Sequence, residues 1–254
     1  MITFEAKIDD RIVRMYSSYP LKNAAGAIFK TLTQIQSQNN TNIFDSKFVL
    51  GFGWSFFYTS ETKDENGNTF YVLQTNDYRK NPFKDRTNDV TLALLAQNMQ
   101  VEAVGVANVK PEVTTFRDTI LVLKEAMNAP DVYMNRTEPS KDGDSGWYFG
   151  LLNDPNEENH KPEDYVKLCS FELFKFRSEA LRVLELPVGT VAVFHDNDMT
   201  ALVDGDDNPM KFTTRDEREK LAAKAREEWS AAIEAAKAAS ANTDETKKED
   251  KKEE

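Results

Sequence analysis

The chain has 254 residues, and at roughly 150 residues per domain this length favours one or two domains. Apolar residues make up 40% of the chain and charged residues 30%, a composition that excludes disorder along most of its length. The formal net charge of −11 argues against a general nucleic-acid-binding protein, because contacts to phosphates need clustered Lys and Arg side chains.

Targeting and membrane signals are weak in this sequence. Charges at Glu5 and Lys7 interrupt the apolar run that a signal peptide needs. The longest apolar runs, 92–96 and 191–194, are far shorter than the roughly 20 residues that cross a bilayer. Cys169 is the single cysteine, so an internal disulfide is excluded. We therefore expect a cytoplasmic protein that makes no membrane contact.

The first elements in chain order are a helix and a hairpin. Apolar residues recur every three or four positions over 20–37, which is typical of one face of a helix. Strand-like runs follow at 47–60 and 69–75. Between them, Asn66-Gly67 is a strong turn signal, so the two runs predict an antiparallel pair.

Two further helices are expected before residue 130. Asn88 or Asp89 can cap a helix that begins at Val90. Residues 101–109 carry β-branched side chains and a glycine and fit a helix or a strand equally well. Residues 114–127 predict a helix that ends before Pro130.

The second half of the sequence predicts short strands around one helix. The predicted strands cover 132–134, 145–150, 190–194 and 200–203, and the last two pair across a turn. Apolar spacing over 172–184 predicts a helix, and the acidic, proline-containing segment 153–164 predicts an exposed loop. The fold class is therefore α+β, with antiparallel sheets and helices packed on them.

Three parts are expected along the chain: an α+β module over 1–128, a second α+β module over 129–212, and a tail over 213–254. The alanine-rich stretch 215–241 predicts a helix with Trp229 as its largest apolar side chain. The Lys- and Glu-rich end, 242–254, predicts disorder.

Metal and cofactor motifs are not recognisable, and we expect neither group. His160, His195 and Cys169 are too few for a protein-ligated zinc site. An aspartate cluster precedes residue 208, but it lacks the spacing and the closing glutamate of a calcium loop, so solvated turn residues are expected at Asp196, Asp198, Asp204, Asp206 and Asp207.

One enzymatic hypothesis is available, a thiol hydrolase that uses Cys169 and His195 as nucleophile and base. Cys169 lies in an apolar stretch, where a cysteine more often serves as a small buried hydrophobic residue. We therefore expect no catalytic residues. A different alternative is an adaptor that docks a partner through the alanine-rich helix.

A set of short motifs in the second half resembles a known family. A strand ends in Arg136, the run Asp144-Ser145-Gly146-Trp147 continues into two aromatic residues, and Leu186-Pro187-Val188-Gly189 follows about 40 residues later. In this order, and with an acidic loop between them, the motifs resemble the bacterial immunity protein 33 family over about 130–205. The family-motif residues are Arg136, Asp144, Ser145, Gly146, Trp147, Pro187 and Gly189.

The resemblance implies a small α+β domain that neutralises a bacterial toxin by binding rather than by turnover. The family offers no catalytic residues to transfer. A basic toxin would be attracted by the acidic chain, because complementary fields steer encounter. We therefore expect a protein partner, and the candidate binding residues are Asp142, Asp144, Trp147, Asp154, Glu157 and Glu158. The sequence leaves a second interpretation open, in which Trp147 is a core residue and the acids only keep the surface soluble.

Overall fold

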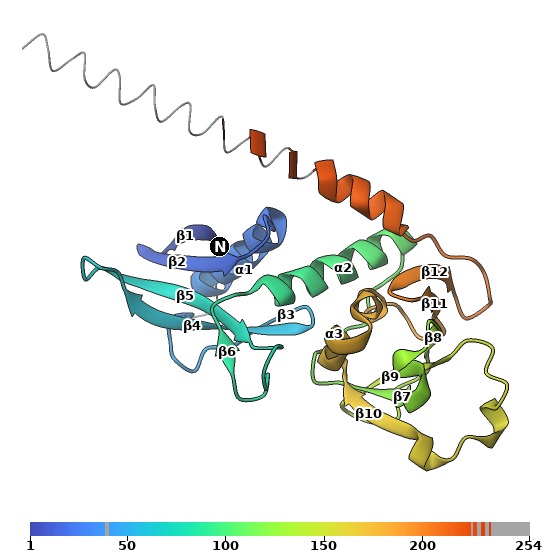
Figure 1. The fold of residues 1–254 in the computed structure, drawn as a ribbon. Coiled ribbons are helices and arrows are strands. Elements are labelled where there is room, and N and C mark those ends of the chain that lie inside the picture. Colours follow the sequence, from blue (N-terminus) through green and yellow to red (C-terminus); the bar gives the residue numbers. More distant parts are fainter. Residues whose placement is uncertain (39–40, 225, 228–229, 232–233, 235–254) are drawn as a thin grey trace, which may run out of the picture. The chain divides into compact units, whose positions relative to one another are not determined.

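The computed structural model describes residues 1–38, 41–224, 226–227, 230–231 and 234. Residues Met1–Phe212 form one compact unit, and the described residues of Thr213–Glu254 form another. The first unit contains two mixed, mostly antiparallel sheets with a few helices (Figure 1), which confirms the α+β prediction.

The strands are β1 (Ile2–Ile8), β2 (Arg11–Ser17), β3 (Leu50–Phe52), β4 (Ser55–Lys63), β5 (Thr69–Asn76), β6 (Arg86–Thr87), β7 (Thr119–Leu123), β8 (Asp131–Arg136), β9 (Asp144–Leu151), β10 (Tyr165–Cys169), β11 (Val191–His195) and β12 (Asp198–Val203). The named α-helices are α1 (Lys22–Gln38), α2 (Thr91–Ala107) and α3 (Leu173–Phe176). Short 3-10 helices cover Lys124–Asn128, Glu157–Asn159, Pro162–Asp164, Ser170–Glu172 and Ser178–Val183.

The first sheet has the order β1-β2-β5-β4-β3, with β6 paired to β5. Its β1–β2 hairpin was not among the predicted elements. The turn uses Asp9 and Asp10, both with positive φ, a conformation that short polar side chains tolerate. Apolar residues alternate with polar ones along β1, and this alternation is the signal that could have predicted the strand.

Three predicted elements of the first half are confirmed. Helix α1 and the antiparallel β4–β5 pair lie where the sequence places them. Helix α2 begins at Thr91, whose backbone N–H donates to Asp89 Oδ1 at 3.0 Å. It continues to Ala107, so the ambiguous segment is helical over most of its length.

The second sheet has the order β10-β7-β9-β8-β11-β12, and β7 pairs with β9 in parallel. The helix predicted over 114–127 is wrong, because strand β7 and a 3-10 helix occupy that stretch. Ile120 and Val122 alternate into the core, and β7 pairs with strands that follow it in the chain. The sheet therefore includes a strand upstream of the expected module boundary at 128/129.

The predicted helix over 172–184 is only partly correct. One α-helical turn, α3, is followed by a 3-10 helix. The break falls at Arg177, which leaves helical geometry with φ −151° and donates from Nη2 to the Ala129 carbonyl at 2.6 Å. This bond anchors the interrupted helix to the loop before β8.

An aromatic cluster joins the two sheets inside the first unit. Trp54, in the turn before β4, stacks on Tyr78 with ring centroids 4.9 Å apart. Its ring meets Phe116 edge-on, and the Phe116 backbone N–H donates to the Trp54 carbonyl at 2.9 Å. Because Trp54 and Phe116 are fully buried, the segment before β7 is held against the first sheet.

The second unit begins with a helix over residues 215–224. Thr214 caps it in a capping box, because its Oγ1 accepts the Glu217 backbone N–H at 3.4 Å while its own backbone N–H donates to Glu217 Oε2 at 2.8 Å. Trp229, which was predicted in this helix, and residues 242–254, which were predicted to be disordered, are outside the described residues. Within the described chain, no helix is long and apolar enough to cross a membrane.

Candidate functional site

The family-motif residues converge on the buried side chain of Arg136, the last residue of β8. Side chains along a strand alternate between its two faces, so Arg136 shares the inner face with Val132 and Met134. The residue is 3% exposed. Burial lowers the pKa of its guanidinium, but an arginine remains cationic in proteins. A positive charge is therefore buried at the end of an internal strand of the second sheet.

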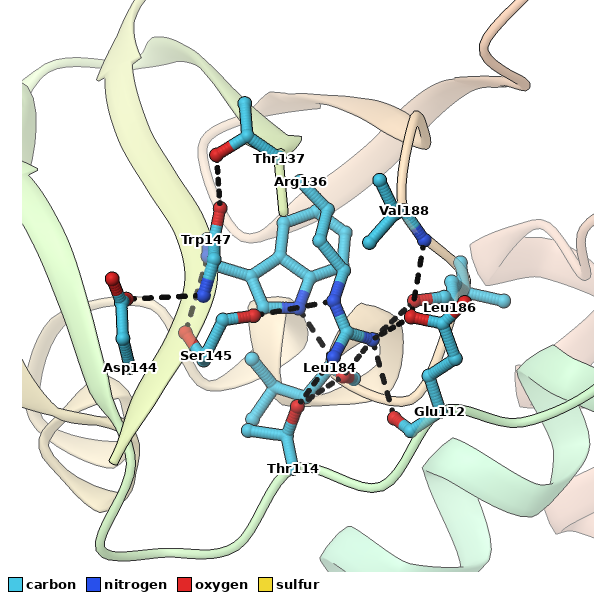
Figure 2. Close-up of polar contacts among 11 residues, drawn as sticks. Glu112, Thr114, Arg136, Thr137, Asp144, Ser145, Trp147, Leu184, Leu186 and Val188 are labelled. Carbon is cyan, nitrogen blue, oxygen red and sulfur yellow. Dashed lines mark hydrogen bonds and ion pairs between the residues drawn. The ribbon is translucent and has the colours of Figure 1, made fainter. Parts of the chain in front are cut away.

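Backbone oxygens satisfy this cation (Figure 2). The guanidinium donates from Nε to the Ser145 carbonyl at 3.2 Å, and from Nη1 to the carbonyls of Glu112, Leu184 and Leu186. Glu112 Oε2 lies 3.9 Å from Nη1 and supplies the nearest negative charge in the close-up. Four carbonyl oxygens from three separate segments thus accept hydrogen bonds from one side chain, and an unpaired buried carbonyl would be costly.

Trp147 is the second member of this arrangement. Its indole Nε1 donates to the Leu184 carbonyl at 3.2 Å, and the guanidinium lies 5.7 Å from the ring centroid. Thr114 Oγ1 donates to the same carbonyl at 2.8 Å. Trp147 is 1% exposed, so of the two interpretations left open by the sequence, the structure shows the core residue. We call Arg136 with Glu112, Thr114, Ser145, Trp147, Leu184 and Leu186 the Arg136 network.

The remaining motif residues shape the backbone around the network. Gly146 has φ +75°, and a Cβ atom there would lie 2.0 Å from the Thr137 carbonyl oxygen. Asp144 Oδ1 accepts the Gly146 N–H at 3.1 Å, which fixes the entry into β9. Gly189 N–H donates to the Arg136 carbonyl at 2.8 Å, and Pro187 accepts from Thr190 in the same turn. These residues maintain the fold of the domain.

Four members of the network, Glu112, Thr114, Leu184 and Leu186, were not among the predicted site residues. Glu112 and Thr114 lie between α2 and β7, in a stretch without a recognisable motif. The inward position of Arg136 could have been read from the alternation of Val132 and Met134. The partners of its guanidinium could not have been read from the sequence, because they are mainly backbone oxygens brought together by tertiary structure.

The predicted acidic binding residues fall into two groups. Asp142 precedes β9 and Asp144 is its first residue, whereas Asp154, Glu157 and Glu158 follow the strand. An eight-residue strand separates them by roughly 23 Å at 3.3 Å per residue, so the structure does not bring the two groups together. Asp142, Glu157 and Glu158 are exposed. Their role in partner binding stays a prediction.

The loop between β9 and β10 is organised by an Asp–His pair. Asp154 Oδ2 lies 2.6 Å from His160 Nε2, and both side chains are less than a tenth exposed. The hydrogen bond to Asp154 raises the pKa of His160, and the same contact lowers the pKa of Asp154. The pair therefore links two positions six residues apart within this acidic loop.

Cys169 and His195 do not form a catalytic pair. Cys169 ends β10 and His195 ends β11, and β7, β9 and β8 lie between these strands. Four strand spacings of about 4.8 Å place them roughly 19 Å apart across the sheet. Burial raises the pKa of the Cys169 thiol, whereas a nucleophilic cysteine needs a lowered one. His195 instead contacts Asp131, with Nδ1 and Oδ1 2.8 Å apart.

The aspartates near residue 204 act within their own turn. Asp204 Oδ1 accepts the backbone N–H groups of Asp206 and Asn208, each at 2.9 Å. Among the residues that the structure describes, no group of three or more His, Cys, Asp or Glu side chains is arranged to hold a metal ion. Backbone capping accounts for the position of the Asp204 carboxylate.

Replacing Arg136 by Lys removes the planar donor group that reaches four carbonyl oxygens. We expect the free energy of unfolding to fall by about 3–5 kcal/mol, measured by urea denaturation. Glu112→Gln leaves those carbonyls paired and retains an acceptor for Val188, so it should cost less than about 1 kcal/mol. Equal losses in the two variants would contradict the network.

Gly146→Ala should be much more costly than Gly143→Ala. Both glycines have positive φ, but only at Gly146 does an added Cβ meet backbone; at Gly143 it meets open space. We expect a loss of about 1 kcal/mol at Gly143 from backbone strain alone. At Gly146 we expect about 3 kcal/mol or more, because the Thr137 carbonyl must also move. Thermal unfolding of both variants measures this difference. Similar unfolding midpoints would refute it.

The pH dependence of the acidic loop follows from His160. Its pKa is raised in the folded state, so the stabilisation from Asp154 is fully present below the ordinary histidine value of about 6.5. This stabilisation is lost as the pH rises through the folded pKa of His160. In NMR titrations, the His160 pKa should lie above that of a model histidine and should fall in Asp154→Asn. A His160 pKa that is unchanged by Asp154→Asn would refute the pairing.

Part of the chain matches a known family of protein domains. The Imm33-like domain model matches residues 97–204. This match confirms the predicted resemblance and extends it upstream into α2. No curated protein and no solved structure matches the chain. The matched residues include the second sheet and every member of the Arg136 network, so this portion of the chain is similar to Imm33-like domains throughout.

Proposed function

We propose that this protein is a non-enzymatic immunity factor that neutralises a bacterial toxin by binding it in the cytoplasm. The match of residues 97–204 to the Imm33-like domain is the observation that carries the proposal. The motif residues support it, because they are used to stabilise the domain and leave its surface available for a partner.

The charge of the chain supports a basic partner. The formal net charge is −11, and exposed carboxylates lie in both loops that flank β9. An anionic surface increases the rate of encounter with a cationic protein, because their fields are complementary. A toxin that acts on nucleic acid carries the opposite charge to its substrate, and such a toxin would suit this surface.

Co-expression with the toxin encoded beside this gene tests the proposal. We expect the wild-type protein to restore growth and to co-purify with the toxin. Cys169→Ala should protect equally well, because a binding protein does not need the thiol. Lack of protection by the folded, abundant wild-type protein would refute the proposal. Protection lost in a folded Cys169→Ala variant would indicate thiol chemistry instead.

A further inference from the structure

The second sheet carries apolar and aromatic side chains on the face turned away from its core. Tyr133 alternates with the buried residues Val132 and Met134, and Tyr148 alternates with Trp147 and Phe149. These outward side chains remain partly accessible. We call this surface the outer face, and it comprises Leu121, Tyr133, Tyr148, Tyr165, Val191 and Val193.

Three tyrosines lie in a row across the outer face. The ring centroids are 5.6 Å apart for Tyr133 and Tyr148, and 6.2 Å apart for Tyr148 and Tyr165. Gly150, which is opposite Tyr133 in the β8–β9 register, provides the space, since a Cβ there would lie 2.5 Å from the Tyr148 ring. Burial raises the pKa of Tyr133, so its hydroxyl remains a neutral donor at physiological pH.

A cavity of about 320 Å³ opens beside this row, and its size is at the lower end of ligand-binding pockets. Its floor consists of Tyr133 from β8 with Val191 and Val193 from β11. The wall consists of Leu151 at the end of β9 and of Leu152, Asn153, Asp154 and Glu157 in the segment that follows.

Hydrogen bonds within the chain hold the wall in place without a partner. The Leu152 N–H donates to the Asp131 carbonyl at 3.1 Å, and Asp154 is held by His160. Asp154 Oδ1 also accepts the Asn156 N–H at 2.8 Å. A preformed wall lowers the ordering cost of binding.

The two carboxylates of the wall differ in their pairing. The Asp154 carboxylate is hydrogen-bonded to His160, whereas the exposed Glu157 carboxylate makes no hydrogen bond or ion pair with any residue that the structure describes. Residues 153–164 contain five acidic side chains and one lysine, so the surroundings add further negative charge. The cavity thus combines an apolar, aromatic floor with an anionic rim.

We propose that this cavity receives an arginine side chain of a basic protein partner. The aliphatic part of an arginine packs against the valines, while its guanidinium stacks on the Tyr133 ring and pairs with the Glu157 carboxylate. The inference rests on the proposed function, and it specifies the surface and the partner chemistry of the immunity factor.

A matched pair of exposed glutamates tests the cavity. Glu157 lines it, whereas its neighbour Glu158 does not. The probe is the capped peptide Gly-Arg-Arg-Gly, titrated into ¹⁵N-labelled full-length protein, with the citrulline peptide as the uncharged control. Wild type and Glu158→Lys should bind the arginine peptide alike, with shifts at the amides of residues 151–157 and 191–193. Glu157→Lys should bind about tenfold more weakly or worse.

Several results would overturn the proposal. Equal binding of the citrulline peptide would show that charge is not recognised. Equal weakening by Glu157→Lys and Glu158→Lys would show only a general electrostatic attraction. Tighter binding of the matching lysine peptide would refute the preference for arginine.

The co-expression assay separates this proposal from the broader function. Glu157→Lys should lose protection against the toxin, while Glu158→Lys keeps it. If wild type and folded Glu157→Lys protect equally, the cavity proposal fails and the immunity function stands. If wild type does not protect, the immunity function fails, and with it the assignment of the cavity to a toxin partner.

Discussion

The second sheet depends on how the buried Arg136 cation is satisfied. An arginine that is 3% exposed loses its hydration, and in this domain carbonyl oxygens from Glu112, Ser145, Leu184 and Leu186 replace it. These four oxygens come from three segments of the backbone, and none of the segments contains Arg136. One side chain therefore fixes the relative positions of the segment before β7, the start of β9 and the turn before β11.

This arrangement separates the part of the domain that is needed for folding from the part available for binding. The motif residues that carry the family resemblance lie in the interior or in tight turns, where Trp147 shares the Leu184 carbonyl with Arg136. The acidic loop and the outer face take no part in the Arg136 network, and the Asp154–His160 pair links two positions within the loop. A binding surface can change its specificity only where the fold does not depend on the side chain.

Local patterns predicted the elements whose signals are contained within a short stretch. Helix α1 follows from apolar spacing and the β4–β5 pair from Asn66-Gly67. Strand β7 was predicted as a helix, because five residues are too few to establish a period and its partners β9 and β10 come later in the chain.

The same limit applies to the candidate site. Sequence identified Arg136 and Trp147 through the family motif, but their burial depends on non-local pairing of β8, β9 and β11. The cavity combines Tyr133 with Val193, which are 60 positions apart in the chain but directly paired across β8 and β11. No short sequence pattern predicts that these two residues are neighbours.

Hydrogen–deuterium exchange of the protein with and without the proposed toxin partner tests whether the Arg136 network supports the fold while the acidic loop contacts the partner. We expect toxin binding to slow the exchange of amides in residues 151–164, while residues 184–190 exchange equally slowly in the free and the bound protein. Increased protection confined to 184–190 and the start of β9, with the 151–164 loop unchanged, would contradict it.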